Sequence, residues 1–243
     1  MNSIKSTEYI EDLQYKGLFI ILDKSLPSFT TDAVLLADFA RVKCTDFVAD
    51  FGTGTGILPL LMHGRYGMRA IGFELQSELC NMAQHSFELN GLSDFLSAEN
   101  ADYTSAYKKY NGAFSAVVCN PPYFDEKSGF SAPDSARALS RTQLSCSLDD
   151  TLCAANKVLK SGGDIFICYP AVRLPEILNS MCMNKLEPKV LRFVRTQKEK
   201  SPYLVLVKGR KDAGKSLSYE PDLVLMNPDG SETDELRRIY HRD

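Results

Sequence analysis

The sequence lacks a long apolar segment and a secretory leader. No stretch of its 243 residues approaches the roughly 18 uninterrupted apolar residues that a membrane helix needs. The first residues, Met1-Asn2-Ser3-Ile4-Lys5, show no basic start followed by an apolar core and a small-residue cleavage site. We therefore expect a cytoplasmic protein with no membrane partner.

Patterns typical of metal sites and disulfide frameworks are also missing. Seven cysteines are scattered without a Cys-x-x-Cys pair, and three histidines lie far apart without ligand spacing. The expected state is therefore free and mostly buried thiols in a reducing compartment. The sequence predicts no metal, and nothing in it indicates an obligate protein partner.

The net charge of -3 conceals an uneven distribution along the chain. Residues 185–215 contain ten lysines and arginines but only three acidic residues, and the remainder of the chain is acidic. A basic C-terminal region on an acidic body could hold a phosphate backbone. The alternative is an ordinary solvated strand face, and the sequence leaves both interpretations open.

Segments with strand and helix character alternate along the chain. Strands are expected at about 47–51, 70–73, 113–119 and 163–168 and near Leu96, and helices at 33–40, 57–62, 77–89, 101–109 and 148–159. Such alternation predicts an α/β fold, with a parallel, doubly wound sheet covered by helices on both faces. Two further strands, 190–194 and 204–207, follow a helix at 174–182. They are joined by a short connection and should form an antiparallel pair at one sheet edge.

We expect one domain over residues 1–243, with an N-terminal extension over 1–45 and the C-terminal basic region over 185–215. The extension has hairpin character at 17–22. Residues 124–146 contain no clear element and are a candidate substrate loop.

A glycine-rich motif, Asp50-Phe51-Gly52-Thr53-Gly54-Thr55-Gly56, follows the first strand of the alternating pattern. A dinucleotide fingerprint would place its third glycine at position 57, where this chain has Ile57. Acidic residues also follow three strands, at Asp50, Glu74 and Asp102. Carboxylates at the ends of parallel strands would repel a pyrophosphate but suit a sulfonium with a free amino group, such as S-adenosylmethionine.

Each residue of this predicted donor pocket has a chemical role. Gly52, Gly54 and Gly56 let the backbone approach the methionine part of the donor, and Asp50 attracts its ammonium group. Glu74 has the spacing of an acid that accepts hydrogen bonds from ribose hydroxyls. The adenine would contact Asp102, Leu75 and Tyr103. A glycine-rich turn without a ligand is the alternative, and Asp102 is the residue for which a purely structural role is most plausible.

The tetrapeptide Asn120-Pro121-Pro122-Tyr123 directly follows another apolar strand. The lone pair of an aromatic or amide amine is delocalised, so two acceptors on its N–H groups favour the pyramidal nitrogen of a methyl-transfer transition state. Asn120 and the carbonyl of Pro121 supply such acceptors, and Tyr123 can stack on a flat target. These three are the predicted catalytic residues, with Asn120 also beside the donor. A rigid loop connector is the alternative.

These residues resemble the class I S-adenosylmethionine-dependent methyltransferases with an N-P-P-[YF] motif. Within them the chain is most similar to the tRNA1(Val) (adenine(37)-N6)-methyltransferases. The resemblance also rests on residues 29–39, on Leu204-Val205-Leu206-Val207-Lys208-Gly209-Arg210-Lys211 and on residues 219–240. It covers nearly the whole chain.

The resemblance implies a Rossmann-like sheet of seven strands, mostly parallel, with the last strand antiparallel. It also implies methylation of the exocyclic N6 of adenine 37, with the tRNA anticodon loop as partner. In relatives the segment that holds Thr31 and Asp32 lies near the donor, although an ordinary helix cap would equally explain these residue types. A base in an anticodon loop is already outside a duplex, which lowers the cost of turning it into a pocket.

Three other interpretations remain open. An N5-glutamine protein methyltransferase would use the same pair of acceptors on a side-chain amide, but such enzymes carry an N-terminal helical domain for which about 45 residues leave little room. Another RNA or DNA adenine-N6 methyltransferase is a closer alternative. A non-catalytic module that binds S-adenosylmethionine or RNA is disfavoured because Asn120, Pro121 and Tyr123 are all retained.

Overall fold

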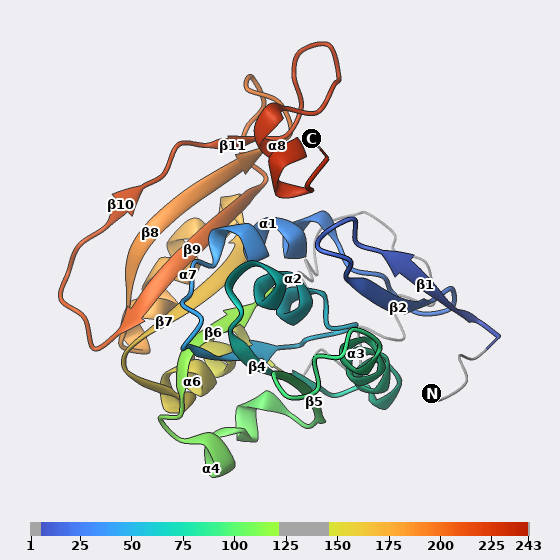
Figure 1. Cartoon of the computed structure of the whole chain (residues 1–243). Helices are drawn as coiled ribbons and strands as arrows, with labels where there is room; N and C mark the ends of the chain where they lie inside the picture. The colour runs from blue at the N-terminus through green and yellow to red at the C-terminus, as the bar shows by residue number, and fades with distance from the viewer. Residues whose placement is uncertain (1–5, 122–145, 243) are drawn as a thin grey trace.

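The computed structural model describes residues 6–121 and 146–242. Their main feature is a mixed sheet with the strand order β10-β8-β9-β7-β6-β3-β4-β5 and β11 paired to β8 (Figure 1). The main strands, in sheet order, are β8 (Leu186–Arg195), β9 (Leu204–Lys211), β7 (Leu159–Pro170), β6 (Phe114–Cys119), β3 (Phe47–Phe51), β4 (Arg69–Glu74) and β5 (Leu96–Asn100). Strands β7, β6, β3, β4 and β5 are parallel, whereas β9 runs antiparallel to β7 and β8.

The strand order confirms the predicted fold class and refines it at one edge. The seven main strands include an antiparallel last strand, β9, which lies between β7 and β8 rather than at the rim. Two strands of two residues each, β10 (Ser218–Tyr219) and β11 (Leu223–Val224), extend the sheet beyond β8. Because the chain proceeds from β3 outward to β4 and β5 and then returns to β6 on the other side of β3, the order reverses there. Such a reversal is where α/β proteins bind ligands.

Helices cover both faces of the sheet (Figure 1). The elements are α1 (Thr31–Phe39), α2 (Ile57–Tyr66), α3 (Ser77–Leu89), η1 (Tyr103–Ser105), α4 (Tyr107–Tyr110), α6 (Leu148–Val158), η2 (Ala171–Arg173), α7 (Leu174–Met183) and α8 (Asp234–Ile239). Alternate residues of β3 enter different cores, since Val48 packs with residues of α1 and α2 and Ala49 packs with residues of α6 and α7. The strands are therefore apolar on both sides, as expected for a sheet covered by helices.

The N-terminal extension begins with a hairpin of β1 (Glu8–Asp12) and β2 (Phe19–Asp23), which confirms the hairpin character near 17–22. It is fixed to α3 by side chains that complete its backbone hydrogen bonds. The Ile21 amide donates to Ser86 Oγ at 2.9 Å, and Asn90 Nδ2 donates to the Phe19 carbonyl at 2.7 Å. Within the described residues no helix has the length and apolarity to cross a membrane, and no group of three or more His, Cys, Asp or Glu could hold a metal ion.

Strand β8 is joined to the C-terminal segment through a buried arginine. The side chain of Arg192 is 7% exposed, and one guanidinium nitrogen lies 2.8 Å from both carboxylate oxygens of Glu235 on α8. Its Nε donates to the Pro221 carbonyl at 2.9 Å. A buried guanidinium is costly unless its donors are all used. The pair therefore holds α8 and the 220–224 segment against the sheet.

Replacing Arg192 with Ala should lower the free energy of unfolding by about 2–3 kcal/mol, because it removes hydrogen bonds to a carboxylate and leaves a void beside α8. Lys185→Ala is a matched control at an exposed position of the same basic region and should change stability by less than about 0.5 kcal/mol. Chemical denaturation of both variants checks this, and equal stabilities would mean that α8 is held by apolar packing alone.

Candidate active site

The ends of β3, β4 and β6 lie at one edge of the sheet. In the parallel register Phe51 is opposite both Phe73 and Cys119, so the residues that follow these three positions are neighbours. They are the glycine loop after β3, Glu74 at the end of β4 and Asn120 after β6. The fold therefore brings together three motifs that are separated along the sequence by 20 to 50 residues.

The glycine loop is held by the end of β4. The amides of Gly52 and Thr53 both donate to the Phe73 carbonyl at 3.0 Å, and the Gly54 amide donates to Glu74 Oε2 at 3.0 Å. The other oxygen of Glu74 accepts from the Gln76 amide at 3.0 Å. Gly56 has φ of +87°, and a Cβ there would come within 2.9 Å of the Phe87 ring, so the third glycine permits both the left-handed turn into α2 and its packing on α3.

Asp50 is fully buried beneath this loop without a hydrogen-bonding partner. Neither carboxylate oxygen, nor the hydroxyl of nearby Thr53, has a hydrogen bond within the described residues. Burial is the main reason why the pKa of Asp50 is raised to about 7. The nearby Thr53 hydroxyl opposes the shift through its dipole, without a well-formed hydrogen bond, and the charge of Glu74 adds to the shift. Burial also raises the pKa of Glu74, against the bonds from Gln76 and Gly54. A buried acid without a hydrogen-bonding partner, such as Asp50, suits a cationic ligand.

A cavity of about 330 Å³ lies beside the glycine loop, and five segments of the chain line it. They are the β2–α1 connection with the start of α1, the glycine loop with the start of α2, the end of β4, the start of α3 and the turn after β6. Of the predicted site residues, Gly52, Gly54, Glu74, Asn120 and Pro121 line this cavity. Asp50, on β3, and Gly56, in the glycine loop, do not contribute to the cavity wall.

Two side chains from other elements fix the orientation of the Asn120 amide. The Cys168 thiol on β7 donates to Asn120 Oδ1 at 3.0 Å, and Asn120 Nδ2 lies 3.5 Å from Thr30 Oγ1 before α1. The two contacts place the amide oxygen toward β7 and its nitrogen toward α1. A carbonyl oxygen has two lone pairs, so the bond from Cys168 is compatible with one from a further donor.

Four residues that the sequence predicts to contact the cofactor lie outside the wall of this cavity. Asp102 accepts from the Thr104 amide at 2.8 Å and caps η1, and Leu75 is 42% exposed outside the cavity wall. The ring of Tyr103 stacks on Phe51 with 4.5 Å between centroids, and its hydroxyl lies 3.1 Å from Thr151 Oγ1 of α6. Both rings belong to the core that α6 and α7 form on one face of the sheet. Thr31 is exposed as the first residue of α1, and its neighbours Thr30 and Asp32 line the cavity instead. Tyr123 and positions 124–145 of the candidate loop lie outside the described residues.

Sequence reasoning missed a contact at the cavity wall. Asp32 on α1 accepts from the Tyr203 hydroxyl before β9 at 3.3 Å, across 171 residues of sequence. Burial raises the pKa of Asp32, although the Tyr203 bond opposes the shift. The segment Phe29-Thr30-Thr31-Asp32 resembles the family and was expected near the donor. Nothing in the sequence around Tyr203 indicated that it would be a neighbour of this cavity.

The fold and the site define the class of protein. A parallel sheet with a glycine loop after its first core strand, an acid after the second and Asn-Pro after the fourth is the arrangement of a methyltransferase. The methyltransferase small domain matches residues 30–206, and the chain belongs to this family. As a methyltransferase, it takes its methyl group from S-adenosylmethionine.

Relatives and solved structures agree with the family. The chain is 27% identical to the tRNA1(Val) (adenine(37)-N6)-methyltransferase of Porphyromonas gingivalis over 82% of this chain and 80% of the relative. It is 25% identical to the enzyme of that name from Actinobacillus pleuropneumoniae over 94% and 95%. A crystal structure of a predicted O-methyltransferase from Agrobacterium tumefaciens shares the fold, with a TM-score of 0.68 and 18% identity over 86% of this chain and 95% of that one.

The buried Asp50 should make stability depend on pH. Its pKa in the folded chain, about 7, is above the ordinary carboxyl value of 3.8, so the folded state retains a proton that the unfolded state loses between these values. The free energy of unfolding should fall as pH rises through this window, by at most about 1.4 kcal/mol per unit. The amide of the Asp50→Asn variant does not ionise, so the stability of this variant should lack the pH dependence that Asp50 causes.

Denaturation of the ligand-free chain and of the Asp50→Asn variant at pH 5, 6, 7 and 8 measures this effect. The variant should gain stability over the parent as pH rises, because the proton that the folded parent retains on Asp50 is absent from the variant. A stability difference that stays constant over the four pH values would show that Asp50 is ionised throughout.

Proposed function

We propose that this methyltransferase transfers the methyl group of S-adenosylmethionine to the exocyclic N6 of an adenine in tRNA, at position 37 next to the anticodon of tRNA1(Val). The observation that carries the proposal is that Asn120 and Pro121, which supply acceptors for an amino group, line the same cavity as the glycine loop. We take the substrate, adenine 37 of tRNA1(Val), from the names of relatives that are 25–27% identical to the chain.

The described residues fit the cofactor. The buried, unpaired carboxyl of Asp50 would face the ammonium group of the methionine part across the glycine loop, directly or through water. Glu74 uses both oxygens on backbone amides, so the same carboxylate would both shape the loop and accept bonds from ribose hydroxyls. When bound, S-adenosylmethionine supplies a methyl group activated by its positively charged sulfur.

The chain's part in the reaction is to hold and polarise the target amine. Asn120 Oδ1 and the Pro121 carbonyl would accept its two N–H groups, which concentrates the lone pair on nitrogen as the new bond forms. Cys168 and Thr30 preset the Asn120 amide, which avoids reorganisation during reaction. No strong base is required, because the methylated and positively charged nitrogen loses a proton readily. We further propose that the adenine stacks on the ring of Tyr123.

The basic region divides into paired and exposed residues. Six of its ten cations contact other parts of the chain: Lys189, Arg192, Arg195, Lys208, Arg210 and Lys211. Of the exposed lysines, Lys198 and Lys200 lie in the β8–β9 connection, and Tyr203 of that connection reaches Asp32 of the cavity. Lys185 and Lys215 lie beyond the opposite ends of the same strands. We assign RNA phosphate contacts to Lys198 and Lys200.

The direct test is mass spectrometry of nucleosides from bulk tRNA incubated with the chain and a labelled donor. Label should enter N6-methyladenosine, whereas label in protein would favour the glutamine alternative.

Asn120→Ala should lower turnover at least about a hundredfold, because one preorganised transition-state contact is removed, with donor affinity by calorimetry nearly unchanged. Near-normal turnover of this variant would contradict the assigned role.

Reversing the charges of Lys198 and Lys200 to Glu should weaken tRNA binding and flatten its dependence on salt concentration. The variant with Lys185 and Lys215 changed to Glu alters net charge equally at the opposite sheet edge and serves as the control. Filter binding over a series of salt concentrations compares the two. Equal losses in both variants would indicate a general charge effect rather than phosphate contacts at the cavity edge.

A further inference from the structure

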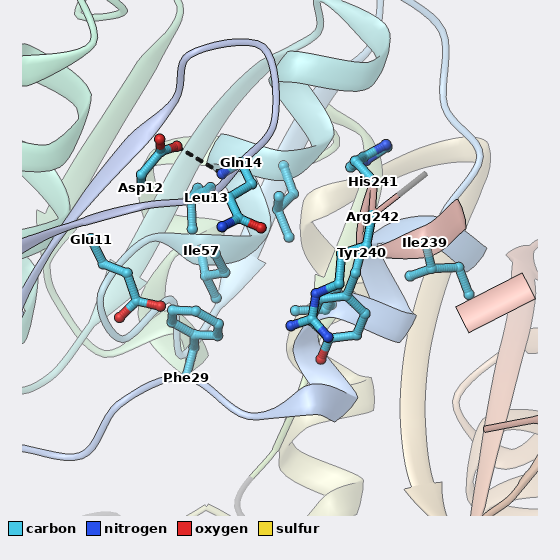
Figure 2. A pocket seen from close by; sticks show the side chains of 12 residues that line it. Glu11, Asp12, Leu13, Gln14, Phe29, Ile57, Ile239, Tyr240, His241 and Arg242 are labelled. Atoms are coloured by element: carbon cyan, nitrogen blue, oxygen red, sulfur yellow. Dashed lines mark hydrogen bonds between the residues drawn. The ribbon is translucent and has the colours of Figure 1, made fainter. Parts of the chain in front are cut away.

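A second cavity of about 290 Å³ adjoins the donor cavity and lies between the N-terminal hairpin, α1, α2 and the C-terminal residues (Figure 2). The two cavities share Phe29 and Ile57 as wall residues. In Figure 2, Phe29 and Leu13 stand on the side of the hairpin and Tyr240 and Arg242 on the opposite side. The cavity thus has aromatic and aliphatic walls, with polar groups, including Asp12 and Gln14, at its rim.

The backbone around this cavity is locally strained. Gln14 and His241, from its two sides, have φ of 52° and 56°, in the left-handed region that residues with a Cβ rarely adopt. The Tyr15 ring stacks on His241 with 3.7 Å between centroids and holds the hairpin turn against the chain's C-terminal end. Residues in such conformations cluster at binding sites, where the surrounding structure maintains them.

A cationic pocket adjoins this cavity and shares His241 with it. Its wall contains Arg41, Arg65 and Arg238 around one acid, Asp38. Asp38 pairs with Arg65 at 2.5 Å and with Arg238 at 3.2 Å, while Arg41 is 71% exposed and lies 3.5 Å from Glu220. Arg238 also lies 3.6 Å from Glu235, so each of the three guanidinium groups has an acidic neighbour. Arg41 is the most exposed of them and can still contact a phosphate.

We propose that the second cavity holds a nucleotide of the RNA substrate adjacent to the methylated one. Its base lies between Phe29 and Tyr240, and its phosphate faces the arginine pocket. Acceptors at the rim, namely the carboxylates of Asp12 and Glu11 and the side-chain amide oxygen of Gln14, select a base edge that donates hydrogen bonds, such as an exocyclic amino group. The shared Phe29 places this base beside the donor cavity. The inference rests on the proposed function, because it assumes an RNA substrate.

The test uses a double variant that removes two of these base contacts, Gln14 and Tyr240, without straining the chain. Gln14→Gly suits the positive φ, and Tyr240→Leu retains apolar volume but removes the ring. The matched control is Asp212→Gly with Tyr219→Leu, since Asp212 also has positive φ (56°) and Tyr219 is 65% exposed on β10, away from both cavities. An RNA stem-loop that contains the target adenine is the probe.

The cavity variant should bind this RNA at least about tenfold more weakly, as expected for loss of one stacked base, and the control within about twofold. Donor affinity by calorimetry should be unchanged in both, because neither pair lines the donor cavity. Gln14→Gly alone should also weaken binding severalfold, which keeps the test valid if Tyr240→Leu impairs folding. In RNA with 2-aminopurine next to the target, the fluorescence quenched by the parent chain should recover with the cavity variant.

Parental affinity of the cavity variant for RNA would overturn the inference and leave the proposed function intact. Failure of the parent chain itself to bind or methylate the RNA would refute the proposed function, and the assignment of this cavity with it.

Discussion

The carboxylate of Glu74 joins two strand ends, and the rest of the site depends on this connection. By accepting from the amides of Gly54 and Gln76, it fixes the loop after β3 relative to the loop after β4. The loop in turn encloses Asp50, whose buried oxygens have no hydrogen-bonding partner in the described chain. An unpaired buried polar group lowers the free energy of unfolding by about 1–3 kcal/mol. The ligand-free chain is therefore less stable than it could be, but it keeps a carboxyl that can interact with a cationic ligand.

Most of the fold was predictable because the sheet is covered on both sides. Strands buried on two faces are continuous apolar runs, and those at 47–51 and 113–119 appeared where expected. The helix expected at 101–109 is instead η1 and α4, because Asp102 caps a short turn at that position. The position of β9 between β7 and β8, and the two-residue strands β10 and β11, depend on tertiary pairing that no local pattern specifies.

The grouping of residues at the cavity was predictable where they follow strands, since parallel strand ends converge. Glu74, Asn120 and the glycine loop were expected to lie together for this reason, and they line one cavity. The contacts of Cys168 with Asn120 and of Tyr203 with Asp32 join distant segments and left no sequence signal. The charge of residues 185–215 was an incomplete guide, because Lys208 and Arg210 both pair with Asp164 on β7. A count of charges does not show which of them are already neutralised.

The proposed reaction requires that two oxygens after β6 bind the target amine beside the methyl donor. A crystal structure of the chain with S-adenosylhomocysteine and an adenine-containing oligonucleotide would locate both groups. We expect the exocyclic nitrogen to lie about 3 Å from both Asn120 Oδ1 and the Pro121 carbonyl, with the sulfur of the cofactor product beside the glycine loop. An adenine bound with its amino group away from Asn120, or a cofactor outside the cavity lined by the glycine loop, would contradict the proposal.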